Sequence, residues 1–403
     1  MVGRLFGGRA SVPNLVIAQR VIDKMAAAAA SYLEDETGEA MVGVVVPNPH
    51  SGVATVYVLE TIAPDASAIR HQHTFQQGDE RQDEMLYWWR ENWRVYRATL
   101  SPDKPLDYKW NVPLHHIGDW HKQPGFMIQP SGGDLMTALE WLGAPENKLD
   151  FMLAPILTLG HPPSTDSNGM GHAYLLIPSG DAQMRVDWWY IDLKTRGFLP
   201  ITPTVYPDAS LPALPAPPWH LADEKRFDLE CRRLRDHGLF LSLTLWDADS
   251  APPLEVCLLV AHAAWEHLLL VVTPHDYPAH PPRARIAPFI PMDGDDDLYA
   301  VFEQAWAQSQ PLDPAPETWD ADRWLVDYVG ALAAAHGLAF TPAAAVEIVT
   351  DAPAPPGQAA LDALTTAPAV SATPPSGERT SLPSEAAPPG EAAPQPQKDE
   401  RDV

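Results

Sequence analysis

Residues 118–124 read Gly-Asp-Trp-His-Lys-Gln-Pro, and residues 130–134 read Pro-Ser-Gly-Gly-Asp. We expect a strand to end in the first segment and a helix to begin at the second. The stretch places His121, Ser131 and Asp134 at a spacing that zinc hydrolases use. Such enzymes need ligands that leave one position open for water, a carboxylate that accepts its proton, and an oxyanion donor. His121 and Asp134 are candidate ligands, Ser131 is a candidate donor, and Glu36 is the best candidate carboxylate.

The order of these residues resembles the JAMM/MPN metalloisopeptidases. That family has a glutamate, then His-x-His-Pro, six residues, and Ser-x-x-Asp. Here Glu36 precedes His121-x-x-Pro, six residues, and Ser131-x-x-Asp134. The resemblance implies that Glu36 is the general base, His121 and Asp134 bind Zn²⁺, and Ser131 stabilises the oxyanion. Gln123 stands where the family has its second zinc histidine.

Gln123 leaves two interpretations open. An amide oxygen is a neutral, hard ligand and a poorer partner for zinc than imidazole nitrogen, so zinc binding is weakened or absent. The chain is then either an isopeptidase with unusual metal chemistry or a metal-free scaffold. Other histidines are poor substitutes for the missing zinc ligand, because none has the spacing of the family. They are His115, His116, His161 and His172.

The charge of the chain excludes several partners. Its 403 residues include 53 acidic and 27 basic ones, which gives a formal net charge of −26. Phosphate backbones and anionic lipids are repelled by such a charge. We therefore expect no nucleic-acid or membrane partner, and favour a basic or neutral protein surface.

The cysteines and the apolar stretches indicate a cytoplasmic protein. Cys231 and Cys257 are too few for a disulfide framework, and no Cys-x-x-Cys pair occurs. The amino terminus lacks the apolar core of a secretory signal. The longest apolar stretch, around residues 256–272, is interrupted by His262, Glu266 and His267, so no membrane span is predicted.

The first half of the chain has the pattern of an α/β unit with a mixed sheet flanked by helices. Helical spacing and an alanine run predict a first helix over residues 15–32. Further helices are expected at 82–93 and 131–142, and strands at 40–46, 53–59, 114–118, 151–158, 173–178 and 184–191. A polar loop at 160–171 is expected to border the cleft. His71-Gln72-His73 is interpreted as a loop, because the i, i+2 spacing converges on a metal only in a strand.

The second half begins with a charged helix at 222–236 and three strands at 239–246, 254–260 and 268–272. Residues 277–282 then read Tyr-Pro-Ala-His-Pro-Pro before a fourth strand, with helices expected at 298–307 and 322–335. This order resembles the ubiquitin-conjugating-enzyme and RWD fold. No cysteine follows the Tyr-Pro-x-x-Pro-Pro turn, and Cys257 falls in a predicted buried strand. We therefore expect this unit to bind rather than to transfer.

The expected organisation is a JAMM/MPN-like domain at residues 12–205 and a proline-rich linker at 206–220. A conjugating-enzyme-like domain follows at 221–341, and 342–403 form a disordered tail rich in Ala, Pro, Ser, Gly and Glu. The two resemblances together imply a protein that processes or removes a ubiquitin-like modifier. Its expected partners are that modifier, its conjugates, and activating or conjugating enzymes.

Overall fold

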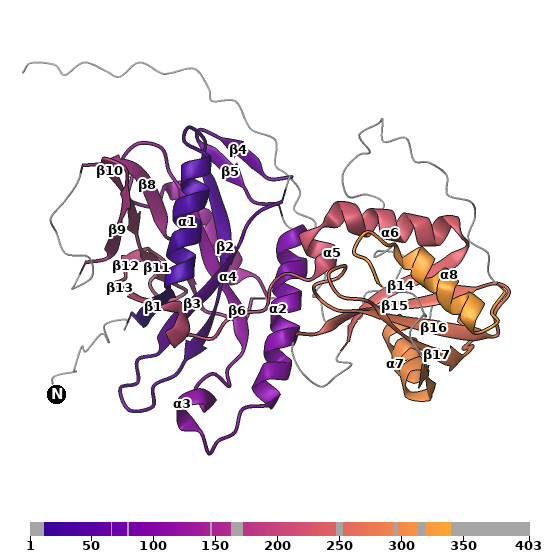
Figure 1. Ribbon diagram of the computed structural model, residues 1–403. Helices are drawn as coiled ribbons and strands as arrows, with labels where there is room; N and C mark the ends of the chain where they lie inside the picture. Colours follow the sequence, from indigo (N-terminus) through magenta and orange to yellow (C-terminus); the bar gives the residue numbers. More distant parts are fainter. Residues whose placement is uncertain are drawn as a thin grey trace, which may run out of the picture.

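The computed structural model describes residues 12–339, apart from positions 66, 79 and 146 and segments 163–171, 247–252, 293–296 and 313–318. It is a mixed α/β protein with two main sheets (Figure 1). This confirms the fold class expected from the sequence. The predicted tail at 342–403 and most of the predicted loop at 160–171 lie outside the described residues. The predicted domain boundaries stay a prediction.

The amino-terminal sheet has its strands in the order β12-β11-β7-β6-β2-β3-β1-β13, and β8, β10 and β9 extend it from β6. Its strands are β1 (Asn14–Ala18), β2 (Thr37–Val46), β3 (Thr55–Ile62), β6 (Leu114–Lys122), β7 (Phe151–Leu153), β8 (Ile156–His161), β9 (Tyr174–Ser179), β10 (Ala182–Asp187), β11 (Trp189–Asp192), β12 (Leu199–Pro200) and β13 (Pro203–Tyr206). β1 runs parallel to β3 and β13, and β6 runs parallel to β7 and β8. The predicted mixed sheet is therefore present.

The start of the chain differs from the prediction. Residues 14–18 form β1, and helix α1 covers only Gln19–Ser31. β1 lies inside the sheet, between β3 and β13, and Leu15, Val16, Ile17 and Ala18 are all buried in the core. An apolar run buried on both faces shows no alternation, so periodicity alone did not separate this strand from a helix.

Two further predictions need correction. The run expected at 151–158 is two strands, because Pro155 separates β7 from β8 and both pair with β6. His71 and His73 belong to a β-hairpin rather than an irregular loop: β4 (Ile69–His71) pairs with β5 (Thr74–Gln76). His73 lies at the turn of that hairpin.

Besides α1, the described residues of this half form three helices. α2 (Glu80–Ala98) is longer than predicted, α3 (Pro105–Tyr108) is short, and α4 (Gly132–Gly143) begins where the sequence indicated. α1 covers one face of the sheet, and α2 lies between the two main sheets (Figure 1).

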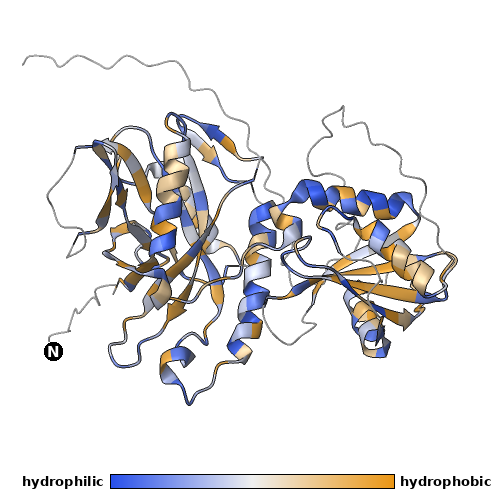
Figure 2. Cartoon of the chain, viewed as in Figure 1, coloured by the Kyte–Doolittle hydropathy of each residue, from blue (hydrophilic) through white to orange (hydrophobic). Residues whose placement is uncertain are grey.

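The carboxy-terminal sheet is an antiparallel meander in the order β14-β15-β16-β17-β18. Its elements are α5 (Trp219–Ala222), α6 (Glu224–Asp236), β14 (Leu239–Trp246), β15 (Glu255–His262), β16 (His267–Thr273), β17 (Arg283–Pro288), α7 (Leu298–Gln308), β18 (Gln310–Pro311) and α8 (Leu325–Ala335). The core on one sheet face includes α6 and α8 residues, and the core on the other includes α7 residues. Figure 2 shows apolar strands beneath an α6 whose outward face is hydrophilic.

Side chains of α2 join the two halves. Trp88 and Trp89 donate their indole N–H groups to the carbonyls of Ala216 and Pro215 in the connecting segment, at 3.1 and 2.9 Å. Asn92 is 1% exposed and accepts a 2.7 Å hydrogen bond from the backbone N–H of Leu254, just before β15. The connecting segment is therefore held to the first half by hydrogen bonds.

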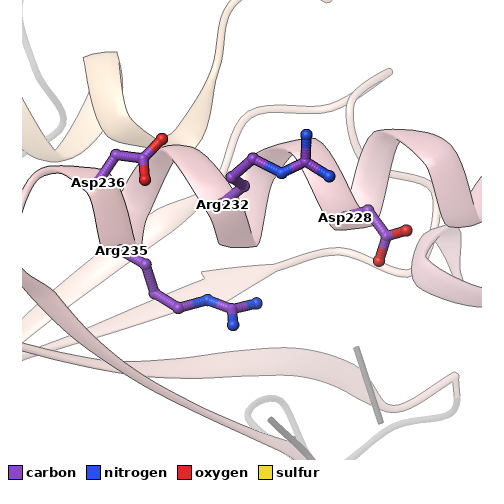
Figure 3. A pocket seen from close by; sticks show the side chains of 4 residues that line it. All are labelled: Asp228, Arg232, Arg235 and Asp236. Atoms are coloured by element: carbon purple, nitrogen blue, oxygen red, sulfur yellow. The ribbon is translucent and has the colours of Figure 1, made fainter. Parts of the chain in front are cut away.

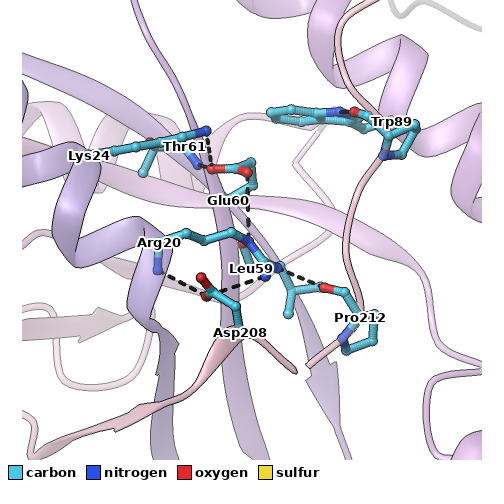
Figure 4. Close-up of polar contacts among 9 residues, drawn as sticks. Arg20, Lys24, Leu59, Glu60, Thr61, Trp89, Asp208 and Pro212 are labelled. Atoms are coloured by element: carbon cyan, nitrogen blue, oxygen red, sulfur yellow. Dashed lines mark hydrogen bonds and ion pairs between the residues drawn. The ribbon is translucent and has the colours of Figure 1, made fainter. Parts of the chain in front are cut away.

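Arg20 of α1 bonds the same connecting segment (Figure 4). Its guanidinium donates to the carbonyls of Leu59 and Pro212, at 2.8 and 2.7 Å, and its backbone N–H donates to Asp208. Lys24, one turn further along the helix, pairs with Glu60 at 2.7 Å.

No helix among the described residues has the length and apolar character required to cross a bilayer.

Candidate functional site

His121 is the second-last residue of β6, and Gln123 is the first residue after that strand. A β-bulge against β2 bends β6 beside Gly118, whose φ is +133°, and a Cβ there would lie 1.9 Å from the carbonyl oxygen of Leu153. Only glycine fits such a position without strain. Beyond the bend, the N–H groups of His121 and Gln123 donate to the carbonyls of Pro155 and Leu157. The bend therefore carries the end of β6 alongside β8.

Ser131 and Asp134 begin α4 as a capping box. The Ser131 hydroxyl accepts from the Asp134 N–H at 3.2 Å, and Asp134 Oδ2 accepts from the Ser131 N–H at 2.6 Å. This arrangement fixes the carboxylate with its other oxygen, Oδ1, 3.9 Å from Nε2 of His121. The Ser131 hydroxyl keeps its own proton for donation, because it only accepts in this box.

Glu36 ends the connection between α1 and β2. The next two residues pair with the end of β6, since Thr37 lies opposite Lys122 and Gly38 opposite His121. The Glu36 N–H donates to the carbonyl of His71 in the hairpin at 2.9 Å. Three separate elements, β6, α4 and the start of β2, thus bring the predicted acid and the His121–Asp134 pair together.

The charges of the site act on one another. Burial raises the pKa of the Glu36 carboxyl above its usual range, and the Asp134 charge raises it further, whereas His73 and Lys122 oppose the rise. Burial lowers the pKa of His121, and Asp134 opposes that change. A carboxyl group with a raised pKa suits proton transfer near neutral pH. A neutral imidazole suits metal ligation.

The separation of His121 and Asp134 is close to that of two ligands of one zinc ion. Two donors bound about 2.1 Å from one tetrahedral zinc lie roughly 3.4 Å apart. The 3.9 Å between His121 Nε2 and Asp134 Oδ1 is close to that separation. Gln123 is 6% exposed, and its amide oxygen is buried without a hydrogen-bond partner. An oxygen of this kind is available as a weak third ligand.

Among the residues that the structure describes, no third strong ligand joins this pair. In the described part of the chain, no three His, Cys, Asp or Glu side chains form a group that could hold a metal ion. His116 pairs with Asp119 at 2.8 Å, and His161 bonds Thr158 at 2.7 Å. His115 and His172, whose spacing in the sequence also makes them poor substitutes, belong to no such group among the described residues.

Two residues beside the site were not assigned to it from the sequence. His73 acts on Glu36 electrostatically from the hairpin turn. Lys122, between His121 and Gln123, is 1% exposed. A lysine that ends a buried strand is rare enough to have been a signal.

The second half contains no reactive thiol. Cys231 and Cys257 are both buried and unbridged. Burial raises the pKa of Cys231 to about 12 and that of Cys257 well above its usual range. The thiols are therefore protonated at neutral pH, as the prediction of a core thiol at Cys257 requires.

A surface hollow lies over α6 in the second half (Figure 3). Its lining is wholly charged and comprises Asp228, Arg232, Arg235 and Asp236. The i, i+4 alternation of acid and base is typical of a solvated helix face. The hollow has no part in the site at the end of β6.

Comparisons with known proteins give a distant relative and a solved structure of low similarity. No protein-family model matches the chain. Over 183 residues it is 22% identical to the CD-NTase/cGAS isopeptidase of Enterobacter hormaechei subsp. hoffmannii, an alignment that covers 45% of this chain and 84% of that protein. A solution structure from Desulfitobacterium hafniense is matched at 12% identity, covering 48% of this chain and 93% of the other. Its TM-score of 0.28 is too low to carry an argument.

Proposed function

We propose that the chain is an isopeptidase-like hydrolase that processes or removes a ubiquitin-like modifier and uses weakly held zinc. The observation that carries the proposal is the 3.9 Å distance between His121 and Asp134. The charge of the same Asp134 carboxylate also raises the pKa of Glu36. The similarity to a protein named isopeptidase supports cleavage of an isopeptide bond.

In this proposal His121, Asp134 and the free amide oxygen of Gln123 hold the zinc ion. Zinc held there would supply a Lewis acid for a carbonyl and would lower the pKa of a water molecule. Glu36 accepts the proton of the attacking water at its carboxylate and returns it to the leaving amine. The Ser131 hydroxyl donates to the developing oxyanion.

The second half has a binding role in this proposal. Its thiols are buried, so it does not carry a modifier as a thioester. The bonds from Trp88, Trp89 and Asn92 hold it against the first half. A modifier or a conjugating enzyme bound there is kept at high local concentration near the site.

The alternative is a metal-free scaffold that binds the same partners. The observation that favours it is Gln123, because the group contains only two strong ligands, His121 and Asp134. A metal ion with two strong ligands binds weakly, and the fold would then serve recognition alone.

Metal content and cleavage distinguish the two functions. Full-length protein, Gln123→His and His121→Ala are purified in buffer containing zinc, and bound zinc is measured by mass spectrometry. Zinc at one per chain in the unaltered protein, lost in His121→Ala, excludes the metal-free scaffold. Zinc bound only by Gln123→His excludes the hydrolase.

Cleavage is then measured on a ubiquitin-like protein joined through its terminal glycine to a reporter. We expect activity in the unaltered protein and loss of at least a hundredfold in Glu36→Gln, in the range of a lost general base. Equal rates in both proteins would remove Glu36 from the proposed chemistry.

A further inference from the structure

Lys122 is among the most completely buried large side chains of the protein, at 1% exposure. Lysine is almost never buried to this degree unless its ammonium has partners. It ends β6, between the candidate ligands His121 and Gln123. Alternate residues of a strand point to opposite faces, so the Lys122 side chain leaves β6 on the side away from those two.

The partner of Lys122 is the segment that carries Glu36. Its Nζ donates a 3.0 Å hydrogen bond to the carbonyl of Leu33. Burial lowers the pKa of Lys122, and the charges of Asp35, Glu34 and Glu36 oppose that change. The ammonium thus lies within electrostatic reach of three consecutive acids.

Among the described residues, few other contacts hold residues 32–36 in place. Leu33 is 67% exposed and Tyr32 is 37% exposed, so the segment buries little apolar surface. Two described hydrogen bonds join the backbone of this segment to the rest of the fold. Lys122 Nζ donates to the Leu33 carbonyl, and the Glu36 N–H donates to the His71 carbonyl. Arg70 adds a guanidinium 4.5 Å from the centre of the Tyr32 ring. Segments with so few buried contacts open readily.

We propose that Lys122 is a positioning residue, whose buried ammonium holds the acidic turn at residues 33–36 against β6 and so keeps the Glu36 carboxylate beside the His121–Asp134 pair. The proposal rests on the proposed function for its catalytic consequence only. The placement of the turn can be measured in a protein that shows no activity. A displacement of about 1 Å in a reacting group lowers rates on the order of a hundredfold.

The test uses Lys122→Met, Lys122→Arg and Lys24→Met. Methionine keeps an apolar stem and removes the ammonium, whereas arginine keeps a donor. Lys24 is the matched control, because it bonds Glu60 from α1 and makes no bond to residues 32–36. Amide hydrogen exchange of peptides covering residues 32–38 is recorded for each full-length variant, together with kcat and KM on the reporter fusion.

For Lys122→Met we expect exchange at 32–38 at least tenfold faster, kcat about a hundredfold lower, and KM within a factor of two. Arginine is expected to recover most of both losses, and Lys24→Met to change neither. Unchanged exchange in Lys122→Met, or no recovery by arginine, overturns the proposal. If no variant or parent cleaves the fusion, the exchange result alone decides the proposal, and only the proposed function fails.

A measurement on the unaltered protein covers the case in which Lys122→Met does not fold. With ¹⁵N-lysine and ¹³C-carbonyl-leucine labels, the bond to Leu33 is expected as a slowly exchanging ammonium signal coupled to one leucine carbonyl. Absence of that signal, with the other lysines observed, overturns the proposal.

Discussion

Nε2 of His121 lies 3.9 Å from Oδ1 of Asp134, although one residue belongs to the end of β6 and the other to the first turn of α4. The hydrogen bond from the Ser131 N–H to the other Asp134 oxygen makes this approach possible, because it fixes the carboxylate in one orientation. A group that caps a helix thus also aims a candidate ligand. The two roles of the capping residues can be separated by mutation.

Ser131→Gly and Ser131→Ala should differ in stability and agree in activity. Alanine at an N-cap costs about 1 kcal/mol, whereas glycine costs only a few tenths. Both remove the hydroxyl that is proposed to donate to the oxyanion. Urea unfolding should therefore show Ser131→Ala to be the less stable variant, while cleavage of the reporter fusion falls in both.

Thr99→Ala is the control for this pair, because the Thr99 hydroxyl bonds the Tyr96 carbonyl at the end of α2, away from the site. It should leave cleavage unchanged. Full activity in Ser131→Gly would show that Ser131 acts on α4 alone.

Much of this arrangement could be predicted from the sequence. The separation of His121 and Asp134, followed by an apolar helix, predicted that both lie where a strand is followed by a helix that begins at Ser131. These relationships are local, so spacing along the chain determines them. The assignment of chemical roles to these residues stays a prediction.

The remaining features depend on contacts between distant segments. β1 is a strand because β3 and β13 lie on either side of it, and residues 14–18 alone do not contain that information. The bond from Lys122 to Leu33 joins residues 89 positions apart, and that from Leu254 to Asn92 spans 162. Only the three-dimensional arrangement of the sheets reveals such pairs.

Asn92→Leu should weaken the junction between the two halves. Asn92 accepts from the Leu254 N–H at 2.7 Å and donates to the Trp88 carbonyl at 2.8 Å, both within buried surroundings. Leucine has a similar size but leaves the Leu254 N–H without its acceptor, which costs about 1–3 kcal/mol. We expect a lower urea midpoint and faster amide exchange at the start of β15.

Asn111→Leu is the comparison for this change, since Asn111 bonds Arg97 within the first half. Its exchange at β15 should match that of the unaltered protein. An Asn92→Leu protein with normal exchange there would contradict a coupling role for Asn92.

The hydrogen bonds and the ion pair around Glu230 should contribute strongly to the stability of the second half. Glu230 is fully buried and accepts from the Tyr277 hydroxyl at 2.6 Å, Arg226 Nε at 2.9 Å and the Leu325 N–H at 2.8 Å. Removing one partner of a buried ion pair costs about 3–5 kcal/mol. Arg226→Met should therefore lower the free energy of unfolding more than Tyr277→Phe, which removes one hydrogen bond to the carboxylate and costs about 1.5–3 kcal/mol.

Arg232→Met is the matched surface change, because Arg232 lies on the exposed face of the same helix. Its effect should stay within about 0.5 kcal/mol. Equal losses in Arg226→Met and Arg232→Met, measured by urea unfolding, would contradict a stabilising network around Glu230.

His220 should make the protein lose stability as the pH falls from 6.5 to about 4. Burial lowers the pKa of His220 from 6.5 to about 4, and its Nδ1 is buried without a partner against Phe227. Above pH 6.5 the imidazole is neutral in both the folded and the unfolded chain. Below it the unfolded chain binds a proton that the folded protein does not, so the free energy of unfolding falls by up to about 3 kcal/mol across this window.

Replacing the imidazole with a ring that does not titrate separates this effect from general acid sensitivity. His220→Phe should make the free energy of unfolding less dependent on pH between 6.5 and 4, because no proton binds at that position in either state. The exposed His50 is the control, and His50→Gln should keep the pH dependence of the unaltered protein. Urea unfolding at half-unit pH steps measures all three proteins. If His220→Phe retained the full loss of stability, titration of His220 would not be its cause, and other buried groups would have to account for it.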